Sequence, residues 1–280
     1  MEVGIGLPNA TLGATGSDIV TFAREAEQAG FSCLGTIDRI AYPNHEPLTA
    51  LAAAAAVTER IKLVTSILLA PLRTNTALFA KQAATVDALA DGRLLLGLAP
   101  GGRDDDYELS GADFKRRGRT FDRQLEDLRR LWDGGEVAPK APGGPTVILG
   151  GTVDASFRRA AEHGAGWIMG GGPPDAFKEA LPKLEAAWRD AGRDGEPRKM
   201  ALGYYSLGPR AEENAREKLG HYYAWLGDYA QGVVEGAAKD ADTVKAYLAA
   251  FEEAGCDEFI LFPSDSDPEQ VGLLRAALDE

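Results

Sequence analysis

The sequence predicts an α/β protein built as a single (β/α)8 TIM barrel, because apolar strand segments alternate with helical segments eight times along its 280 residues. The clearest example lies between Glu59 and Gly111. Ile61 to Leu69 is a nearly continuous aliphatic run, which is typical of a parallel strand buried on both faces. Asn75 to Leu89 follows with apolar residues at helical spacing, and Leu94 to Ala99 is a second buried strand that ends in a glycine-rich polar loop.

The remaining elements follow the same alternation. The expected strands are short and apolar, and they are Val3 to Leu7, Cys33 to Ile37, Ile61 to Leu69, Leu94 to Ala99, Val147 to Leu149, Gly166 to Met169, Met200 to Ser206 and Glu258 to Phe262. The expected helices are Asp18 to Ala29, Pro47 to Thr58, Asn75 to Leu89, Asp113 to Trp132, Ala155 to His163, Asp175 to Ala191, Ala211 to Leu226, Lys239 to Ala254 and Glu269 to Leu278. The loop from Gly134 to Pro145 could link two domains, but neither half would have enough strands to close a barrel. Residues 1–280 are therefore interpreted as one domain.

Composition restricts the classes of partner. The net charge of -13 and the pI near 4.8 argue against nucleic acid or an anionic membrane as a partner, since both are bound through excess Lys and Arg. Cys33 and Cys256 lie far apart beside apolar runs, which favours two reduced, buried thiols. The N-terminal residues do not resemble a signal peptide, and no apolar run is long enough to span a membrane. We expect a cytoplasmic protein.

The residues that follow the strands indicate where a site would form. In a barrel of this kind they line one face, the C-terminal face, which carries the active site. Gly150, Gly151 and Thr152 separate a strand from a helix, with a further hydroxyl at Ser156. The free N–H groups and positive end of that helix would suit a phosphate, although the same turn also occurs where no phosphate binds.

Other site chemistries have weak support in the sequence. The three histidines lie in no metal-ligand spacing and CxxC is absent, so no metal site is expected. The motifs GxGxxG, GxxxxGK[ST] and GxSxG are absent as well. His45 follows the second strand and could either reach the pocket or be solvated. Asp104, Asp105 and Asp106 are interpreted as a solvated helix cap rather than a metal site.

Several long segments resemble one known family. They are AREAEQAGFSCLGTIDR, PLTALAAAAAVTERIKLVTSILLAPLRTNTALFAKQAATVDALADGRLLLGLAPGG, DFKRRGRTFDRQLEDLRRLW and LGGTVDASFRRAAEHGAGW. In this order they resemble the luciferase-like monooxygenase family, the bacterial luciferase superfamily of flavin- and deazaflavin-dependent enzymes. The likeness runs from Val3 to about Met169, and beyond it only the order of strands and helices is similar.

The resemblance implies a barrel that binds FMN or the deazaflavin F420 at the C-terminal face of its strands. Ser66-Ile67 would be the family's cis peptide beneath the ring. Ala99, Gly101 and Gly102 would lie along the ring or ribityl chain, and the turn at Gly150 would hold the phosphate. The full set of expected cofactor-binding residues is Thr65, Ser66, Ile67, Ala99, Gly101, Gly102, Arg103, Gly150, Gly151, Thr152 and Ser156.

The expected catalytic residues are Asp38, Arg39 and His45. Asp38-Arg39 falls where relatives often carry Asp-His or Glu-His, so Arg39 is a departure from the family. An arginine cannot shuttle a proton at neutral pH, and it would instead stabilise a developing anion or anchor an anionic substrate. The structural alternative is an ion pair between Arg39 and Asp38.

The resemblance implies an oxidoreductase, and we favour a monooxygenase that uses reduced FMN and O2 on a small organic substrate. F420-dependent relatives usually have the histidine and an acidic residue after the loop glycines, where this chain has Arg39 and Arg103. An F420-dependent hydride-transfer dehydrogenase or reductase is the alternative, followed by a non-catalytic flavin-binding protein and a barrel hydrolase without cofactor. The absence of a dinucleotide motif suggests a separate flavin reductase, and the family suggests a homodimer formed through helices of the first half, among them the alanine-rich Pro47 to Thr58.

Overall fold

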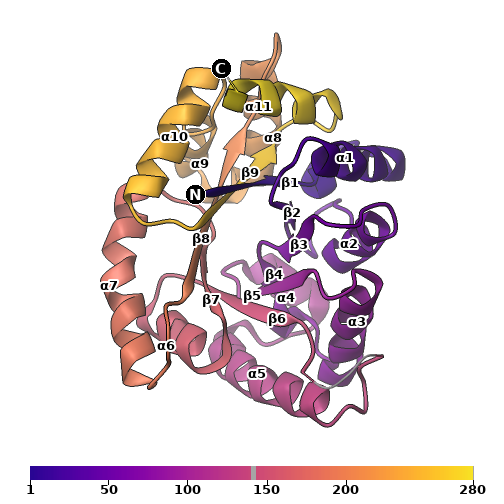
Figure 1. The fold of residues 1–280 in the computed structure, drawn as a ribbon, viewed down its shortest axis with the longest axis vertical. Helices are drawn as coiled ribbons and strands as arrows, with labels where there is room; N and C mark the ends of the chain where they lie inside the picture. Colours follow the sequence, from indigo (N-terminus) through magenta and orange to yellow (C-terminus); the bar gives the residue numbers. More distant parts are fainter. Residues whose placement is uncertain (140–142, 280) are drawn as a thin grey trace.

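The strands of the computed structural model close into a parallel barrel, and the structure describes residues 1–139 and 143–279 (Figure 1). The strands assigned in this part of the chain are β1 Glu2–Gly6, β2 Cys33–Thr36, β3 Lys62–Thr65, β4 Leu68–Leu69, β5 Leu94–Ala99, β6 Thr146–Gly150, β7 Gly166–Met169, β8 Arg198–Tyr205 and β9 Glu258–Pro263. Their order in the sheet is β3-β2-β1-β9-β8-β7-β6-β5-β4, and β3 also pairs with β5. That last pairing closes the sheet and confirms the predicted (β/α)8 barrel.

The third strand of the barrel is interrupted. The sequence predicts one strand from Ile61 to Leu69, but the structure divides it into β3 and β4 at a cis peptide between Ser66 and Ile67. β4 continues the pairing with β5, where Leu68 lies opposite Leu98. The cis peptide lies where the family resemblance predicts it.

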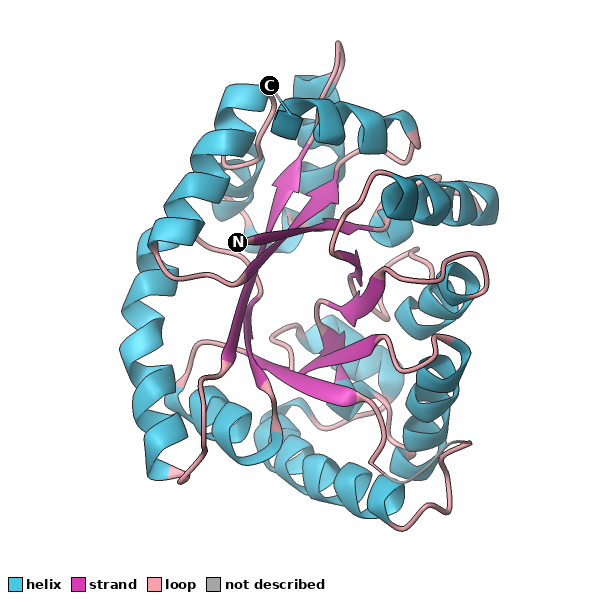
Figure 2. Cartoon of the chain, in the orientation of Figure 1, coloured by secondary structure: helices cyan, strands magenta, loops and turns pink. Residues whose placement is uncertain are grey.

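Helices surround the strands on the outside (Figure 2). Those in the described residues are α1 Gly16–Gln28, α2 Pro47–Ala55, α3 Thr76–Leu89, α4 Asp104–Ser110, α5 Arg117–Asp133, α6 Asp154–His163, α7 Pro174–Asp190, α8 Ala211–Tyr222, α9 Tyr229–Glu235, α10 Ala241–Glu253 and α11 Glu269–Asp279. The short helices α4 and α9 are absent from the sequence prediction, and the predicted helix to Leu226 ends at Tyr222, followed by the 3-10 turn Ala224–Leu226. Across the described residues, no helix is both long and apolar enough to pass through a membrane.

The two halves of the chain contribute to one closed sheet. β5 is the last strand before the predicted loop from Gly134 to Pro145 and β6 is the first strand after it, and the two pair directly through residues such as Leu96 and Val147. Residues 140–142 of that loop lie outside the described residues.

The barrel interior is packed with side chains, so a ligand must bind at its mouth. Ile148, Ile168, Met200, Ile260 and Phe262 belong to one inner cluster, and each has an exposed fraction of 1% or less. A second cluster lies between the strands and the helices. The C-terminal ends of the parallel strands therefore carry the residues that can meet solvent and ligand.

Candidate active site

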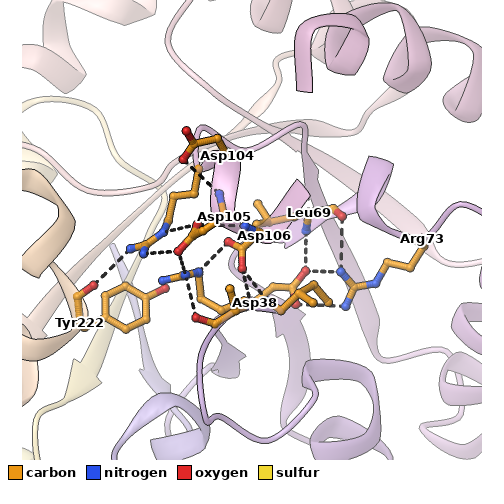
Figure 3. A network of polar contacts seen from close by, with 11 residues as sticks. Asp38, Leu69, Arg73, Asp104, Asp105, Asp106 and Tyr222 are labelled. Atoms are coloured by element: carbon orange, nitrogen blue, oxygen red, sulfur yellow. Dashed lines mark hydrogen bonds and ion pairs between the residues drawn. The ribbon is translucent and has the colours of Figure 1, made fainter. Parts of the chain in front are cut away.

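Asp38 anchors the end of β2 to the chain that follows β4. Its side chain is completely buried, and the carboxylate accepts hydrogen bonds from the Leu69 N–H at 2.7 Å and from both terminal nitrogens of Arg73, one of them at 3.0 Å (Figure 3). Burial raises the pKa of the Asp38 carboxyl, and the Arg73 guanidinium and the Leu69 N–H oppose this effect. Arg73 also lies 3.1 Å from Glu46. Asp38 is thus part of a buried ion pair that joins two loops of the barrel mouth.

Arg39 binds the first turn of α4. Its Nε lies 2.6 Å from Asp106 Oδ2 and its Nη2 lies 3.0 Å from Asp105 Oδ2. The other oxygen of Asp106 accepts from the N–H groups of Ile40 and Ala41 at 2.8 and 2.6 Å. The carboxylate of Asp106 therefore satisfies three donors and fixes the loop after β2 against the loop after β5.

These contacts correct two sequence-based interpretations. The structural alternative of an ion pair between Arg39 and Asp38 is wrong, because each residue pairs with a different partner. The interpretation of Asp104 to Asp106 as a solvated cap is wrong for Asp106, whose side chain is 0% exposed. Arg39 Nη1 is buried and has no hydrogen-bond partner within the described residues.

Arg103 belongs to the same network. Its Nη2 lies 2.8 Å from Asp105, its Nη1 donates to the Tyr222 carbonyl at 3.3 Å, and its guanidinium lies 4.8 Å from the centre of the Trp225 ring. Figure 3 shows Asp105 and Tyr222 at the two sides of these contacts. Arg103 joins the β5 loop to the end of α8, and its predicted role in cofactor binding would have to coexist with these bonds.

His45 lies against the loop that follows β1. Its Nε2 is 2.8 Å from the Ala14 carbonyl, and the side chain of Asn9 donates to the backbone oxygens of Ile37 and His45 at 2.8 and 3.1 Å. Asn9 and His45 therefore join the loops after β1 and β2.

Ile67, the residue after the cis peptide, lies against the ends of β6 and β7. A Cβ at Gly150 would overlap the Ile67 Cδ1 atom, and a Cβ at Gly170 would lie 3.4 Å from it. The glycines at the ends of β6 and β7 thus allow the Ile67 side chain to approach these strands. An apolar platform with glycine edges results.

The two residues before Ile67 differ in their hydrogen bonding. Thr65 is buried and its hydroxyl donates to the Gly97 carbonyl at 2.8 Å, so it bridges two strands. Ser66 Oγ and the nearby Thr36 Oγ1 are buried without a hydrogen-bond partner in the described part of the chain. An unpaired buried hydroxyl is unusual, and a ligand would satisfy it.

The loop after β5 offers open space beside this platform. Ala99 is 7% exposed at the end of the strand, and Gly101 lies against the Leu69 side chain. Gly102 is exposed, and no atom lies within 4 Å of the place where its Cβ would be.

The turn between β6 and α6 has the features of a phosphate site. Gly151 has a φ of +120° and its Cβ position would overlap Ser156 Oγ, so only glycine fits there without strain. Its carbonyl accepts from Trp167 Nε1 at 2.7 Å, which holds the turn in place. Thr152 is exposed, and the residue before α6, Val153, provides no side-chain cap. The Ser156 N–H donates to the Val153 carbonyl at 2.7 Å, and the N–H groups of Asp154 and Ala155 before it can receive an anion.

Sequence reasoning missed a cavity of about 510 Å³ beside these residues. The loop 170–174 forms one wall, the tyrosines Tyr204 and Tyr223 form another, and α9 and α10 complete it. The hydroxyls of Tyr204 and Tyr223 are 2.6 Å apart. The aromatic residues from 222 to 229 were the available signal, but their helix and turn are too short to show a clear periodicity.

Comparison with known proteins agrees with this geometry. The model of the luciferase-like monooxygenase family matches residues 1–272. An uncharacterised protein of Mycobacterium tuberculosis is 34% identical over 210 residues, which cover 62% of this chain and 72% of the relative. Pyrimidine monooxygenase RutA of Cronobacter sakazakii is 30% identical over 207 residues, covering 65% of this chain and 58% of the relative.

Solved structures share the fold. An F420-dependent secondary alcohol dehydrogenase in complex with an F420-acetone adduct superposes with a TM-score of 0.83 at 20% identity, over 99% of this chain and 98% of that one. Monooxygenase RslO1 from Streptomyces bottropensis superposes with a TM-score of 0.77 at 21% identity, over the same shares. The chain therefore belongs to the luciferase-like monooxygenase family, whose members are oxidoreductases that use reduced FMN or F420.

Proposed function

We propose that this protein is a monooxygenase that uses reduced FMN and O2 to oxidise a small organic substrate. The observation that carries the proposal is the pairing of the Ile67 platform with the uncapped N-terminus of α6 across Gly150. A flat ring needs an apolar surface with glycine edges, and its phosphate needs free N–H groups. The residues present fit both needs.

Each predicted residue has a definite part in this proposal. Ser66 and Ile67 would support the ring, Gly101 and Gly102 would border it, and the turn 150–152 would hold the phosphate. Bound reduced FMN supplies the electrons with which O2 is activated. The chain contributes the unpaired Arg39 Nη1 as a fixed positive group and the largely apolar cavity of about 510 Å³ as a space for the substrate.

Charge supports FMN over F420. F420 carries an oligoglutamate tail beyond its phosphate, so it brings more negative charge than FMN. The first turns of α6 and α7 carry the exposed residues Asp154 and Asp175, of which Asp154 lies 3.5 Å from Lys183, and the whole chain has a net charge of -13. A long anionic tail would meet repulsion at this rim.

Hydride transfer with F420 is the second candidate. It is supported by the overlap with the F420-dependent alcohol dehydrogenase, which has a higher TM-score than RslO1. In that case the chain would need no O2, and the cavity would hold the hydride donor or acceptor.

We also propose two partners. A separate reductase would supply reduced FMN, because the chain has no dinucleotide-binding motif. A second copy of the chain would complete a homodimer through the surface of α2 and α3.

The deciding experiment is a parallel titration with FMN and F420, followed by anaerobic reduction and exposure to O2. We expect saturable binding of FMN, weak binding of F420, and O2 consumption when reduced FMN is bound. Tight F420 binding with no O2 consumption would support the second candidate. FMN binding without turnover over a panel of small organic substrates would favour a non-catalytic flavin-binding protein.

A further inference from the structure

Lys218 is a buried cation without a counter-ion. It lies on α8 with 6% of its surface exposed, and its Nζ donates to the carbonyl of Ala10, which follows β1. No carboxylate of the described residues forms an ion pair with Lys218 Nζ. The ring of Tyr222 also lies close to the ammonium, with its centre 5.3 Å from Nζ.

A pocket of about 240 Å³ opens beside Lys218. The loops after β1 and β9 and one face of α8 line it, and two of the lining residues, Thr11 and Ser264, have buried hydroxyl oxygens with no partner among the described residues. Asp265 also lines the pocket, but its carboxylate accepts hydrogen bonds from Asn214 Nδ2 at 2.5 Å and from the Asp267 N–H at 3.1 Å.

The energetics of this arrangement favour an anionic ligand. A buried ammonium with a single carbonyl partner loses its hydration without gaining an opposite charge, which costs several kcal/mol. Burial accordingly lowers the pKa of Lys218 from 10.5 to about 7. An oxyanion would supply the missing charge, and it would accept hydrogen bonds from the hydroxyls of Thr11 and Ser264 after a rotation about χ1.

We propose that Lys218, Thr11 and Ser264 form a subsite for a small oxyanion, either a phosphate or a carboxylate group of a small molecule. The subsite adjoins the candidate active site, because the Tyr222 ring lies 5.3 Å from Lys218 Nζ and 5.8 Å from the guanidinium of Arg39. The inference concerns binding alone, and it does not depend on which cofactor or reaction the protein uses.

The experiment measures the thermal midpoint in inorganic phosphate, in acetate and in chloride at equal ionic strength, at pH 6. A ligand at ten times its dissociation constant stabilises the folded state by about 1.4 kcal/mol, which corresponds to a rise of at least roughly 2 °C for a chain of this size. We expect this rise in phosphate or in acetate, and the stronger of the two responses identifies the group that binds. Equal midpoints in all three salts would overturn the proposal.

Three variants locate the response. Lys218→Met keeps an unbranched side chain that is one atom shorter and removes its charge, so it should fold and lose the response. Ser264→Ala should weaken anion binding about tenfold, the loss of one hydrogen bond to a charged group. Thr152→Glu disturbs only the turn before α6 and should keep the response. A response that disappears in Thr152→Glu and persists in Lys218→Met would place the anion at the α6 turn and overturn the proposal, whatever the outcome for FMN.

Discussion

The Nε atom of Arg39 and the Oδ2 atom of Asp106 lie 2.6 Å apart, in a pair whose side chains are 2% and 0% exposed. The two residues are 67 positions apart in the chain. Their contact fixes the loop after β2, which carries the candidate catalytic residues, to the first turn of α4. The guanidinium of Arg39 therefore combines a structural role with a role in the site. Variants of Asp106 and of Arg39 can separate the two roles.

Replacement of Asp106 tests the structural role. Asp106→Asn keeps the shape of the side chain but removes the buried carboxylate that pairs with Arg39 and leaves only the partly exposed Asp105, so we expect a loss of up to about 3 kcal/mol in the free energy of unfolding. Urea denaturation measures this change in the free energy of unfolding. Asp104→Asn is the matched control, because Asp104 is exposed and an amide oxygen still accepts from the Asp105 N–H, so the change should stay within about 0.5 kcal/mol. Similar losses in both variants would contradict the assignment.

Replacement of Arg39 tests the role in the site. Arg39→Ala should lower turnover about a hundredfold with little change in FMN affinity, since a positive group that stabilises developing charge contributes on the order of 3 kcal/mol. The reduction potential of bound FMN should also decrease, because a positive charge favours the reduced anionic ring. Asp106→Asn is the comparison variant, because it loses stability while the positive charge of Arg39 remains. If Arg39→Ala unfolds more easily but keeps its turnover and potential, Arg39 is a structural residue.

The fold follows from the sequence because each strand is a local apolar run. The runs around Leu94 and Glu258 contain enough information to predict β5 and β9 almost to the residue. Hydropathy cannot reveal where β3 ends and β4 begins, because Ser66 and Ile67 fit within an aliphatic run. The short helix α9 was missed since, of its residues, only Val234 is buried, which leaves no amphipathic pattern to detect.

The site follows from the sequence only in part. The turn at Gly150 and Gly151 can be predicted because a turn before a helix has a local pattern, and the cis peptide is predicted by the family resemblance. The partners of Asp38, Arg39 and Lys218 lie 35, 67 and 208 positions away. A single sequence contains no signal for such long-range pairs, so the burial of these charges became evident only in the fold.

The phosphate turn can be tested with two forms of the flavin. Thr152→Glu adds a negative charge at an exposed position before α6, so we expect FMN affinity to fall at least tenfold while riboflavin, which lacks the phosphate, binds as before. Fluorescence titration gives both affinities. Gly151→Val would be a poor choice, since its φ and the contact with Ser156 would strain the turn itself. Equal losses for FMN and riboflavin would place the phosphate elsewhere.

The proposed dimer has a testable surface. Ala50, Ala54 and Ala55 of α2 are buried within the monomer, but Leu78 and Leu89 of α3 are 54% and 59% exposed. They are three helical turns apart and so lie on one face. Leu89→Arg should convert the dimer to a monomer at micromolar concentration in light scattering. Leu109→Arg, at a leucine of α4 that is 66% exposed, should leave the mass unchanged. A monomeric wild-type protein would refute the proposal.

Lys218 predicts how stability changes with pH in a chloride buffer. Its pKa is lowered from 10.5 to about 7 on folding, so between these pH values the unfolded chain binds a proton that the folded chain does not. Stability should therefore rise from pH 7 towards pH 10.5, and below pH 7 the full cost of burying the charge remains. The difference corresponds to on the order of 5 kcal/mol as an upper bound. Lys218→Met should thus be more stable than the wild type at pH 6, with the two converging as the pH rises.

Urea denaturation of both proteins between pH 6 and 9 measures this convergence. The charged or titratable groups that face the same pocket or pack on Lys218 are Arg210, Glu217, Asp265 and Tyr222, and both proteins contain them. Lys178→Met, at an exposed lysine of α7, should follow the wild-type curve of stability against pH.

Phosphate should reduce the difference in stability between wild type and Lys218→Met at pH 6, because an anion bound to Lys218 stabilises its charged form in the wild type alone. The difference in the free energy of unfolding between wild type and Lys218→Met could instead stay constant from pH 6 to 9. This result would mean that the ammonium of Lys218 remains charged throughout, and that its burial is compensated by a group other than an added anion.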